Sequence, residues 1–91
     1  MFHMHVISKS AMKAFWERHS DAKEPLRAWF RLTEHAEWRD LTDVRKTFNS
    51  ADVVGVFTIF NVKGNTYRII TAIHYNRQKV FIRNVFTHAE L

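Results

Sequence analysis

Residues 61–70, NVKGNTYRII, decide the fold, because they place a Gly-Asn pair between two segments rich in apolar and β-branched side chains. A Gly-Asn pair in this setting is typical of a two-residue loop that joins antiparallel strands. With Gly64 and Asn65 in the loop, Val62 pairs with Tyr67 across the hairpin. The sequence therefore predicts a β-hairpin whose register is determined at this turn.

On both sides of the hairpin, the sequence remains rich in the residue types that favour β-strands. Three segments rich in Val, Ile, Phe and Thr, separated by turn residues, predict an antiparallel meander; they are residues 53–62, 66–74 and 79–86. Near the start, residues 5–8, HVIS, form a short β-branched run that predicts a first strand. A sheet therefore occupies both ends of the sequence.

Helical periodicity fills the region between these strands, in residues 11–19, 20–38 and 40–49. Asp21 and Glu24 have the spacing of a capping box, and Pro25 suits the first turn of the second helix. Asp40 is the expected cap of the third helix. Strand, helices and meander together predict an α+β fold, with the helices packed on one face of a mainly antiparallel sheet.

Composition limits both the size of the fold and its partners. The 91 residues suit one small domain over residues 1–91, and the absence of Cys excludes a disulfide framework and a thiol nucleophile. The formal charge of +5 favours polyanions such as nucleic acid. No apolar run has the length of a membrane span, so we expect a cytoplasmic protein that does not bind a membrane.

The predicted pairing separates the side chains of the meander into two faces. An apolar face suits packing beneath the helices; its members are Phe60, Val62, Ile69, Ile73, Val80, Ile82 and Phe86. The other face carries polar and cationic groups, namely Asn61, Lys63, Arg68 and Arg83, and the register pairs Ile70 with Arg83. Three cations on one face suit a phosphodiester, because Arg can bind phosphate with two N–H groups while Lys acts as a point charge. A solvated sheet face is the alternative explanation.

His88 follows the last strand, where the end of the meander can approach the basic face. An imidazole can donate or accept a proton near neutral pH, so His88 is the candidate for proton transfer. Apart from His3 and His5 near the start of the chain, the six histidines show no HExxH or paired-ligand spacing, and the two glycines do not form a phosphate-binding loop. We therefore expect no metal ion and no cofactor.

Four segments together resemble the HigB toxins of type II toxin–antitoxin modules: MHVIS, RAWFRLTEHAEW, FNVKGNTYRII and IRNVFTHAE, at residues 4–8, 27–38, 60–70 and 82–90. The resemblance implies a RelE-like α+β fold and an endoribonuclease, or mRNA interferase, that cuts messenger RNA, commonly on the translating ribosome. It also implies a HigA-type helix-turn-helix antitoxin as partner. Operator DNA is then contacted only through the toxin–antitoxin complex, and translation is inhibited by loss of the message.

In such toxins the 2′-hydroxyl of the RNA attacks the adjacent phosphate without a metal ion. The resemblance then implies that Arg68 and Arg83 hold the phosphate, that Lys63 assists as cation or base, and that His88 is general acid or base. Three further residues of the matching hairpin motif would orient RNA: Asn61, Asn65 and Tyr67.

One departure from the family pattern concerns the end of the chain. The family motif T-H-x-E usually continues into Tyr-Asp and a polar tail, whereas this sequence ends at Leu91. The resemblance implies that a tyrosine or tail cation for RNA binding is missing and that the chain, if truncated, is weakened or inactive. Two other functions stay open: a non-catalytic basic module that binds nucleic acid or a protein, and a protein whose apolar patch around Ile59, Ile70 and Phe81 receives another chain.

Overall fold

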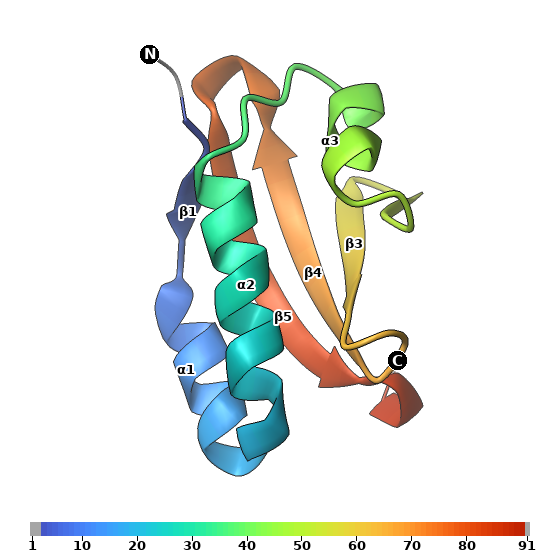
Figure 1. The fold of residues 1–91 in the computed structure, drawn as a ribbon. Helices are drawn as coiled ribbons and strands as arrows, with labels where there is room; N and C mark the ends of the chain where they lie inside the picture. Colours follow the sequence, from blue (N-terminus) through green and yellow to red (C-terminus); the bar gives the residue numbers. More distant parts are fainter. Residues whose placement is uncertain (1–2, 91) are drawn as a thin grey trace.

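A five-stranded mixed sheet in the order β1-β5-β4-β3-β2 supports the structure, a computed structural model that describes residues 3–90 (Figure 1). β1 runs parallel to β5, and the other neighbours are antiparallel. The strands are β1 (His5–Ile7), β2 (Asp52–Val54), β3 (Phe57–Val62), β4 (Tyr67–His74) and β5 (Lys79–Thr87). The predicted α+β class is confirmed, and the departure noted at Leu91 lies outside the described residues.

The three α-helices lie on one face of this sheet (Figure 1). They are α1 (Lys9–Arg18), α2 (Lys23–Glu34) and α3 (Leu41–Thr47), with short 3₁₀ segments η1 (Ser20–Ala22), η2 (Tyr75–Arg77) and η3 (His88–Glu90). In the part of the chain that the structure describes, each helix is too short or too polar to cross a bilayer. The opposite face of the sheet, which we call the uncovered face, carries no α-helix from residues 3–90.

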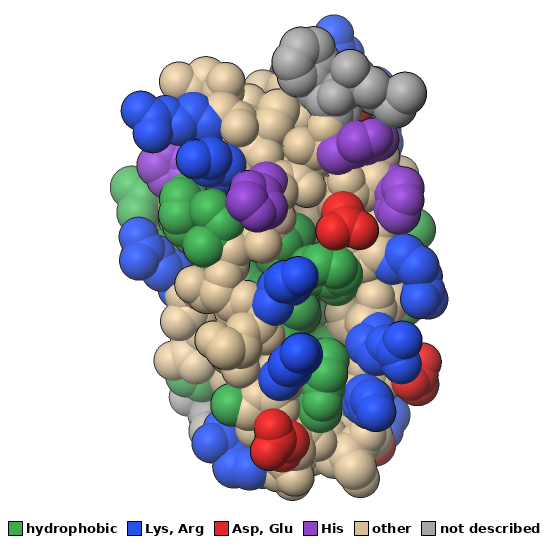
Figure 2. Space-filling view, turned by 90° about the vertical axis from the view of Figure 1, so that its left-hand side faces the viewer, with side chains coloured by type: hydrophobic (Ala, Val, Ile, Leu, Met, Phe, Trp, Pro, Cys, Tyr) green, Lys and Arg blue, Asp and Glu red, His purple; other side chains and the backbone are tan. Residues whose placement is uncertain are grey.

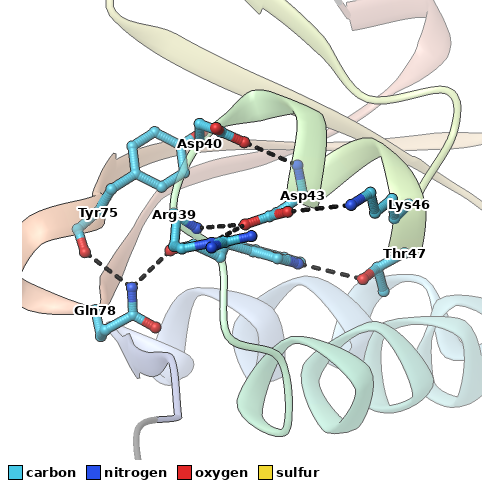
Figure 3. Close-up of polar contacts among 8 residues, drawn as sticks. Arg39, Asp40, Asp43, Lys46, Thr47, Tyr75 and Gln78 are labelled. Atoms are coloured by element: carbon cyan, nitrogen blue, oxygen red, sulfur yellow. Dashed lines mark hydrogen bonds and ion pairs between the residues drawn. The ribbon is translucent and has the colours of Figure 1, made fainter.

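The start of α3 agrees with the sequence, whereas the start of α2 does not. Asp40 caps α3, because its Oδ1 accepts a hydrogen bond from the backbone N–H of Asp43 at 3.0 Å. Figure 3 shows this cap and the Asp43 carboxylate facing Arg39 and Lys46. α2 begins after Ala22 without a side-chain cap, so the capping box predicted at Asp21 is wrong. The Asp21 carboxylate is occupied elsewhere, as described below.

The predicted strand over residues 53–62 is divided in two. Gly55 has a φ of 62°, a left-handed conformation that glycine adopts without a Cβ penalty, and the chain reverses there into a hairpin. β2 therefore pairs antiparallel with β3 and forms one edge of the sheet. The turn exposes several apolar side chains, among them Val56 with 82% of its surface accessible.

The register of the central hairpin matches the prediction. Val62 pairs with Tyr67 and Asn61 with Arg68. The connection is longer than two residues, because Lys63 has a φ of 52° and lies in the turn instead of in β3. Lys63 therefore does not follow the alternation of side chains that the strand imposes.

A β-bulge changes the register between β4 and β5. Near the 75–78 turn Ile73 pairs with Val80, but farther along Ile70 lies opposite Asn84 and not, as predicted, opposite Arg83, which is the extra residue. Beyond the bulge, each residue of β5 therefore lies on the opposite face of the sheet from the one predicted. Val85 is buried in the core with 5% exposed surface, while Phe86, predicted to face the helices, is only partly buried.

Aromatic side chains form the centre of the core between helices and sheet. Phe60 of β3 is fully buried, with its ring centroid 5.3 Å from those of Trp29 and Phe48 and 5.9 Å from that of Trp38. These partners come from α2, from the end of α3 and from the loop between the two helices. The Gln78 amide holds this loop to the η2 turn by donating to the Trp38 and Tyr75 carbonyls (Figure 3).

Candidate active site

Arg68 and Asn61 form a cross-strand pair on the uncovered face of the sheet. The guanidinium Nε of Arg68 donates to Asn61 Oδ1 at 3.1 Å, and both side chains are half-buried. Within residues 3–90 the two terminal nitrogens of Arg68 donate no hydrogen bond. Arg68 lines a hollow of about 320 Å³ together with Asn61, Ile59 and Asp52. Arg68 is therefore held at one nitrogen and open at the two that can bind a phosphate together.

His88 lies at the same end of the sheet as Arg68. Its backbone N–H donates to the carbonyl of Thr66 at 2.9 Å, which continues the ladder one step beyond the pairing of Tyr67 with Thr87. Phe86 pairs with Arg68, so strand alternation turns the Phe86 side chain toward the uncovered face. His88 is the first residue of η3, just past the end of β5, so β5 brings its backbone to this end of the sheet but does not fix the direction of its side chain.

The bulge also turns Arg83 toward the uncovered face. Arg83 and Asn84 are exposed, and they lie between Ile82 and Val85, which are both buried in the core. Two residues between inward-facing neighbours must present their side chains outward. Arg83 is therefore on the same face as Arg68, although the pairing predicted for it is wrong.

Lys63 and Tyr67 are directed to the other side, toward the helices. The Asp21 carboxylate of η1 binds both: Lys63 Nζ lies 2.5 Å from Oδ2, and the Tyr67 hydroxyl donates to Oδ1 at 2.5 Å. The Tyr67 ring is 5% exposed and packs edge-on against Phe15 at 5.3 Å. Because Lys63 lies in the turn, the expectation that it shares a sheet face with Arg68 is wrong.

These contacts set the charges of the Asp21 cluster, which consists of Asp21, Lys63 and Tyr67. The hydrogen bond from Lys63, and next that from Tyr67, holds the pKa of Asp21 below its ordinary value. The same bond to a carboxylate raises the pKa of the Tyr67 hydroxyl. At neutral pH Asp21 is therefore a carboxylate and Tyr67 a protonated phenol.

Sequence reasoning assigned Asp21 to a helix cap and missed this role. Asp21 and Lys63 are separated by 42 positions, and no local pattern connects residues so far apart. Asn65, the remaining candidate for RNA binding, is exposed in the turn between β3 and β4. Within residues 3–90 no group of three or more His, Asp or Glu side chains is arranged to hold a metal ion.

Asp21→Asn is expected to destabilise the fold slightly at neutral pH and not in acid. A carboxylate whose pKa is lowered in the folded state contributes stability above its unfolded pKa, and this contribution disappears as the pH falls through the folded value. Urea unfolding midpoints of both proteins at pH 7 and pH 2.5 test this. Glu17→Gln, at an exposed position of α1 without an ion pair among the described residues, is the control. Equal midpoints at pH 7 would contradict the role of Asp21.

Comparisons with known proteins agree with the fold and identify the family. Residues 22–91 match a family described as HigB_toxin, RelE-like toxic component of a toxin–antitoxin system. The chain is 29% identical over 90 residues to the mRNA interferase toxin HigB of Escherichia coli (strain K12), with 96% of this chain and 86% of the relative covered. The same figures apply to mRNA interferase HigB of Escherichia coli O157:H7 and of Shigella flexneri. The chain belongs to the HigB toxin family.

Proposed function

We propose that this protein, as a single toxin domain over residues 1–91, is an endoribonuclease that cuts messenger RNA. Its relatives are named mRNA interferases, and its family is the toxic component of toxin–antitoxin systems. The observation that carries the proposal is the position of Arg68 on the uncovered face, where its terminal nitrogens donate no hydrogen bond within residues 3–90, with His88 following β5 at the same end of the sheet. The proposal assigns phosphate binding to Arg68 and proton transfer to His88 at the same linkage.

The proposed reaction is a transesterification within the RNA. The 2′-oxygen forms a bond to the adjacent phosphorus and the bond from phosphorus to the 5′-oxygen breaks, which leaves a 2′,3′-cyclic phosphate and a 5′-hydroxyl. The 2′-hydroxyl must lose a proton, and the leaving 5′-oxygen must gain one. His88 supplies one of these transfers. Arg68 and Arg83 bind the phosphate and stabilise the additional negative charge of the transition state, so the chemistry needs no metal ion.

Lys63 acts in this reaction only when its ion pair with Asp21 is broken. Its ammonium group is bound by Asp21, and it reaches the RNA only when that ion pair opens. Asn61 orients the Arg68 guanidinium, and Asn65 and Tyr67 complete the RNA-binding hairpin, with Tyr67 acting through its bond to Asp21. With these roles, the β3–β4 hairpin both positions Arg68 and contacts the RNA.

The proposed setting follows from the substrate. The message is cut on the translating ribosome in the cytoplasm, and a HigA-type helix-turn-helix antitoxin neutralises the toxin. Contact with operator DNA is made by the complex through that antitoxin. The net charge of +5 supports binding to ribosomal or messenger RNA.

Primer extension tests the proposal directly. In an in vitro translation reaction, the protein is expected to produce new 5′ ends on a translated message, and these ends should carry a 5′-hydroxyl. Cleavage should persist with a chelator that removes transition metals while Mg²⁺ is kept for the ribosome. Binding to RNA without new ends would overturn the proposal and favour a non-catalytic basic module.

His88→Ala is expected to slow cleavage about a hundredfold, the lower range for loss of a general acid or base, while RNA affinity stays within about twofold. Single-turnover cleavage rates at saturating ribosomes measure the first effect and filter binding measures the second. His5→Ala, at an exposed position of the far edge strand β1, is the matched control. A His88→Ala rate equal to that of the control would remove His88 from the mechanism.

A further inference from the structure

A groove of about 410 Å³ runs between α1 and α2, on the helical side of the molecule. Its apolar surface comes from Met12 and Trp16 of α1 and Phe30 of α2, of which Met12 is buried and the two aromatic residues are half-buried. Figure 2 shows apolar side chains exposed between Lys and Arg side chains on this side of the molecule. The candidate active site described above uses none of these residues.

The two walls of the groove have the same helical spacing. Each wall is a stripe of positions i, i+3, i+4 and i+7, the spacing of one helix face; the stripes are residues 9, 12, 13 and 16 of α1 and 27, 30, 31 and 34 of α2. Within this pattern the apolar groups lie along the centre and the charged groups along the rims. The groove is therefore a regular surface, and a third helix can pack along it.

The rims of the groove carry more positive than negative charge. Four of the lining side chains are cations, Lys9, Lys13, Arg27 and Arg31, against one carboxylate, Glu34. Within residues 3–90, Lys13 and Arg31 form no ion pair, and Lys9 lies 5.1 Å above the Phe30 ring centroid. Arg27 forms only an exposed pair with Glu24 at 3.4 Å. Most of this charge is available to an acidic partner.

We propose that this groove binds an acidic, amphipathic helical segment of the antitoxin. An apolar stripe on that segment would cover Trp16 and Phe30, and Asp or Glu residues beside the stripe would meet the cations of both rims. The ten residues of α1 give the groove a length of about 15 Å, enough for about three helical turns. The existence of an antitoxin follows from the family, and the proposal does not depend on RNA cleavage.

A protein segment fits this groove better than an RNA strand does. The floor is apolar along both helices, whereas RNA contacts rest on cations that follow the phosphates. The groove also lies on the face of the sheet opposite to Arg68, away from the proposed RNA site (Figure 1).

Charge reversal at the rim tests the proposal. The double variant Lys13→Glu/Arg31→Glu is expected to bind the antitoxin encoded with this toxin at least about tenfold more weakly, mainly through slower association. Both residues are exposed, so the thermal midpoint should stay close to that of the parent. Isothermal titration calorimetry gives the affinity, and surface plasmon resonance gives the association rate. Neither experiment includes RNA.

The matched control is Lys23→Glu/Arg77→Glu, which changes the net charge equally at exposed positions outside the groove. Rescue of the rim variant by reversing an acidic residue of the antitoxin to Lys would support a direct contact. Equal antitoxin affinities for the rim variant, the control and the parent would overturn the proposal. An unchanged antitoxin affinity with weakened ribosome binding would also overturn it and assign the groove to RNA. Neither outcome would affect the cleavage tests of His88.

Discussion

Arg68→Ala is expected to lower the single-turnover rate of RNA cleavage by about 10²- to 10³-fold, the range seen when one preorganised donor to a transition-state oxyanion is removed. The Nε bond to Asn61 holds the guanidinium in place, so its two terminal nitrogens are directed before the RNA arrives. In the transition state the phosphate gains negative charge, and a donor already in position stabilises that charge without reorganisation. The variant should therefore lose rate more than affinity.

The conservative variant separates geometry from charge. Arg68→Lys keeps the positive charge but loses the planar pair of N–H groups and the bond to Asn61, so its rate should lie between those of the parent and Arg68→Ala. Arg77→Ala, which removes an exposed cation in the η2 turn, should leave the rate within about twofold. Rates come from quenched reactions on programmed ribosomes. An Arg68→Ala protein that cuts as fast as the Arg77→Ala protein would refute the proposed phosphate site.

Phe60→Ala is expected to lower the free energy of unfolding by about 3–5 kcal/mol, the range for removal of a fully buried aromatic ring. Phe60 has no exposed surface and contacts aromatic rings from three different segments, Trp29, Trp38 and Phe48. These large, rigid rings cannot collapse into the space left by the substitution. Since small domains have total stabilities of about 5–15 kcal/mol, the variant should be partly unfolded at physiological temperature.

Urea unfolding followed by tryptophan fluorescence measures this loss, with circular dichroism as a second probe of two-state behaviour. Val56→Ala, at the apolar residue with 82% of its surface exposed, is the control and should change stability by less than about 0.5 kcal/mol. A loss below about 1 kcal/mol for Phe60→Ala would show that the core is not centred on this ring. Phe60→Leu should recover part of the stability, because it refills part of the volume.

Local signals in the sequence were sufficient for most of the fold. The Gly-Asn pair predicted the β3–β4 hairpin and its pairing of Asn61 with Arg68, and Asp40 was recognised as a cap from its position before a short helix. The break at Gly55 is also a local signal, since a glycine inside an apolar run indicates a bend or bulge, but the β-branched composition of residues 53–62 predicts one continuous strand. Each of these features depends on residues only a few positions apart.

In the candidate site, local sequence signals predicted the position of one residue, and contacts between distant segments decided the others. Arg68 was placed on the correct sheet face because its register depends on the adjacent turn. Arg83 was assigned the wrong partner, because a bulge forms only when two strands must both bury their apolar residues and pair their backbones. Lys63 was expected beside Arg68, and a left-handed turn residue with an Asp21 carboxylate nearby directs it elsewhere.

By itself, the sequence determined the α+β class, the hairpin that carries Asn61 and Arg68, and the resemblance to the HigB toxins. Tertiary structure alone decided the parallel pairing of β1 with β5, the bulge at Arg83 and the Asp21 cluster. The physical reason is the separation in sequence between the residues that interact. Turns, caps and hairpin registers depend on neighbouring residues, whereas contacts between distant segments form only when the whole chain finds a packing that satisfies its core and its backbone together.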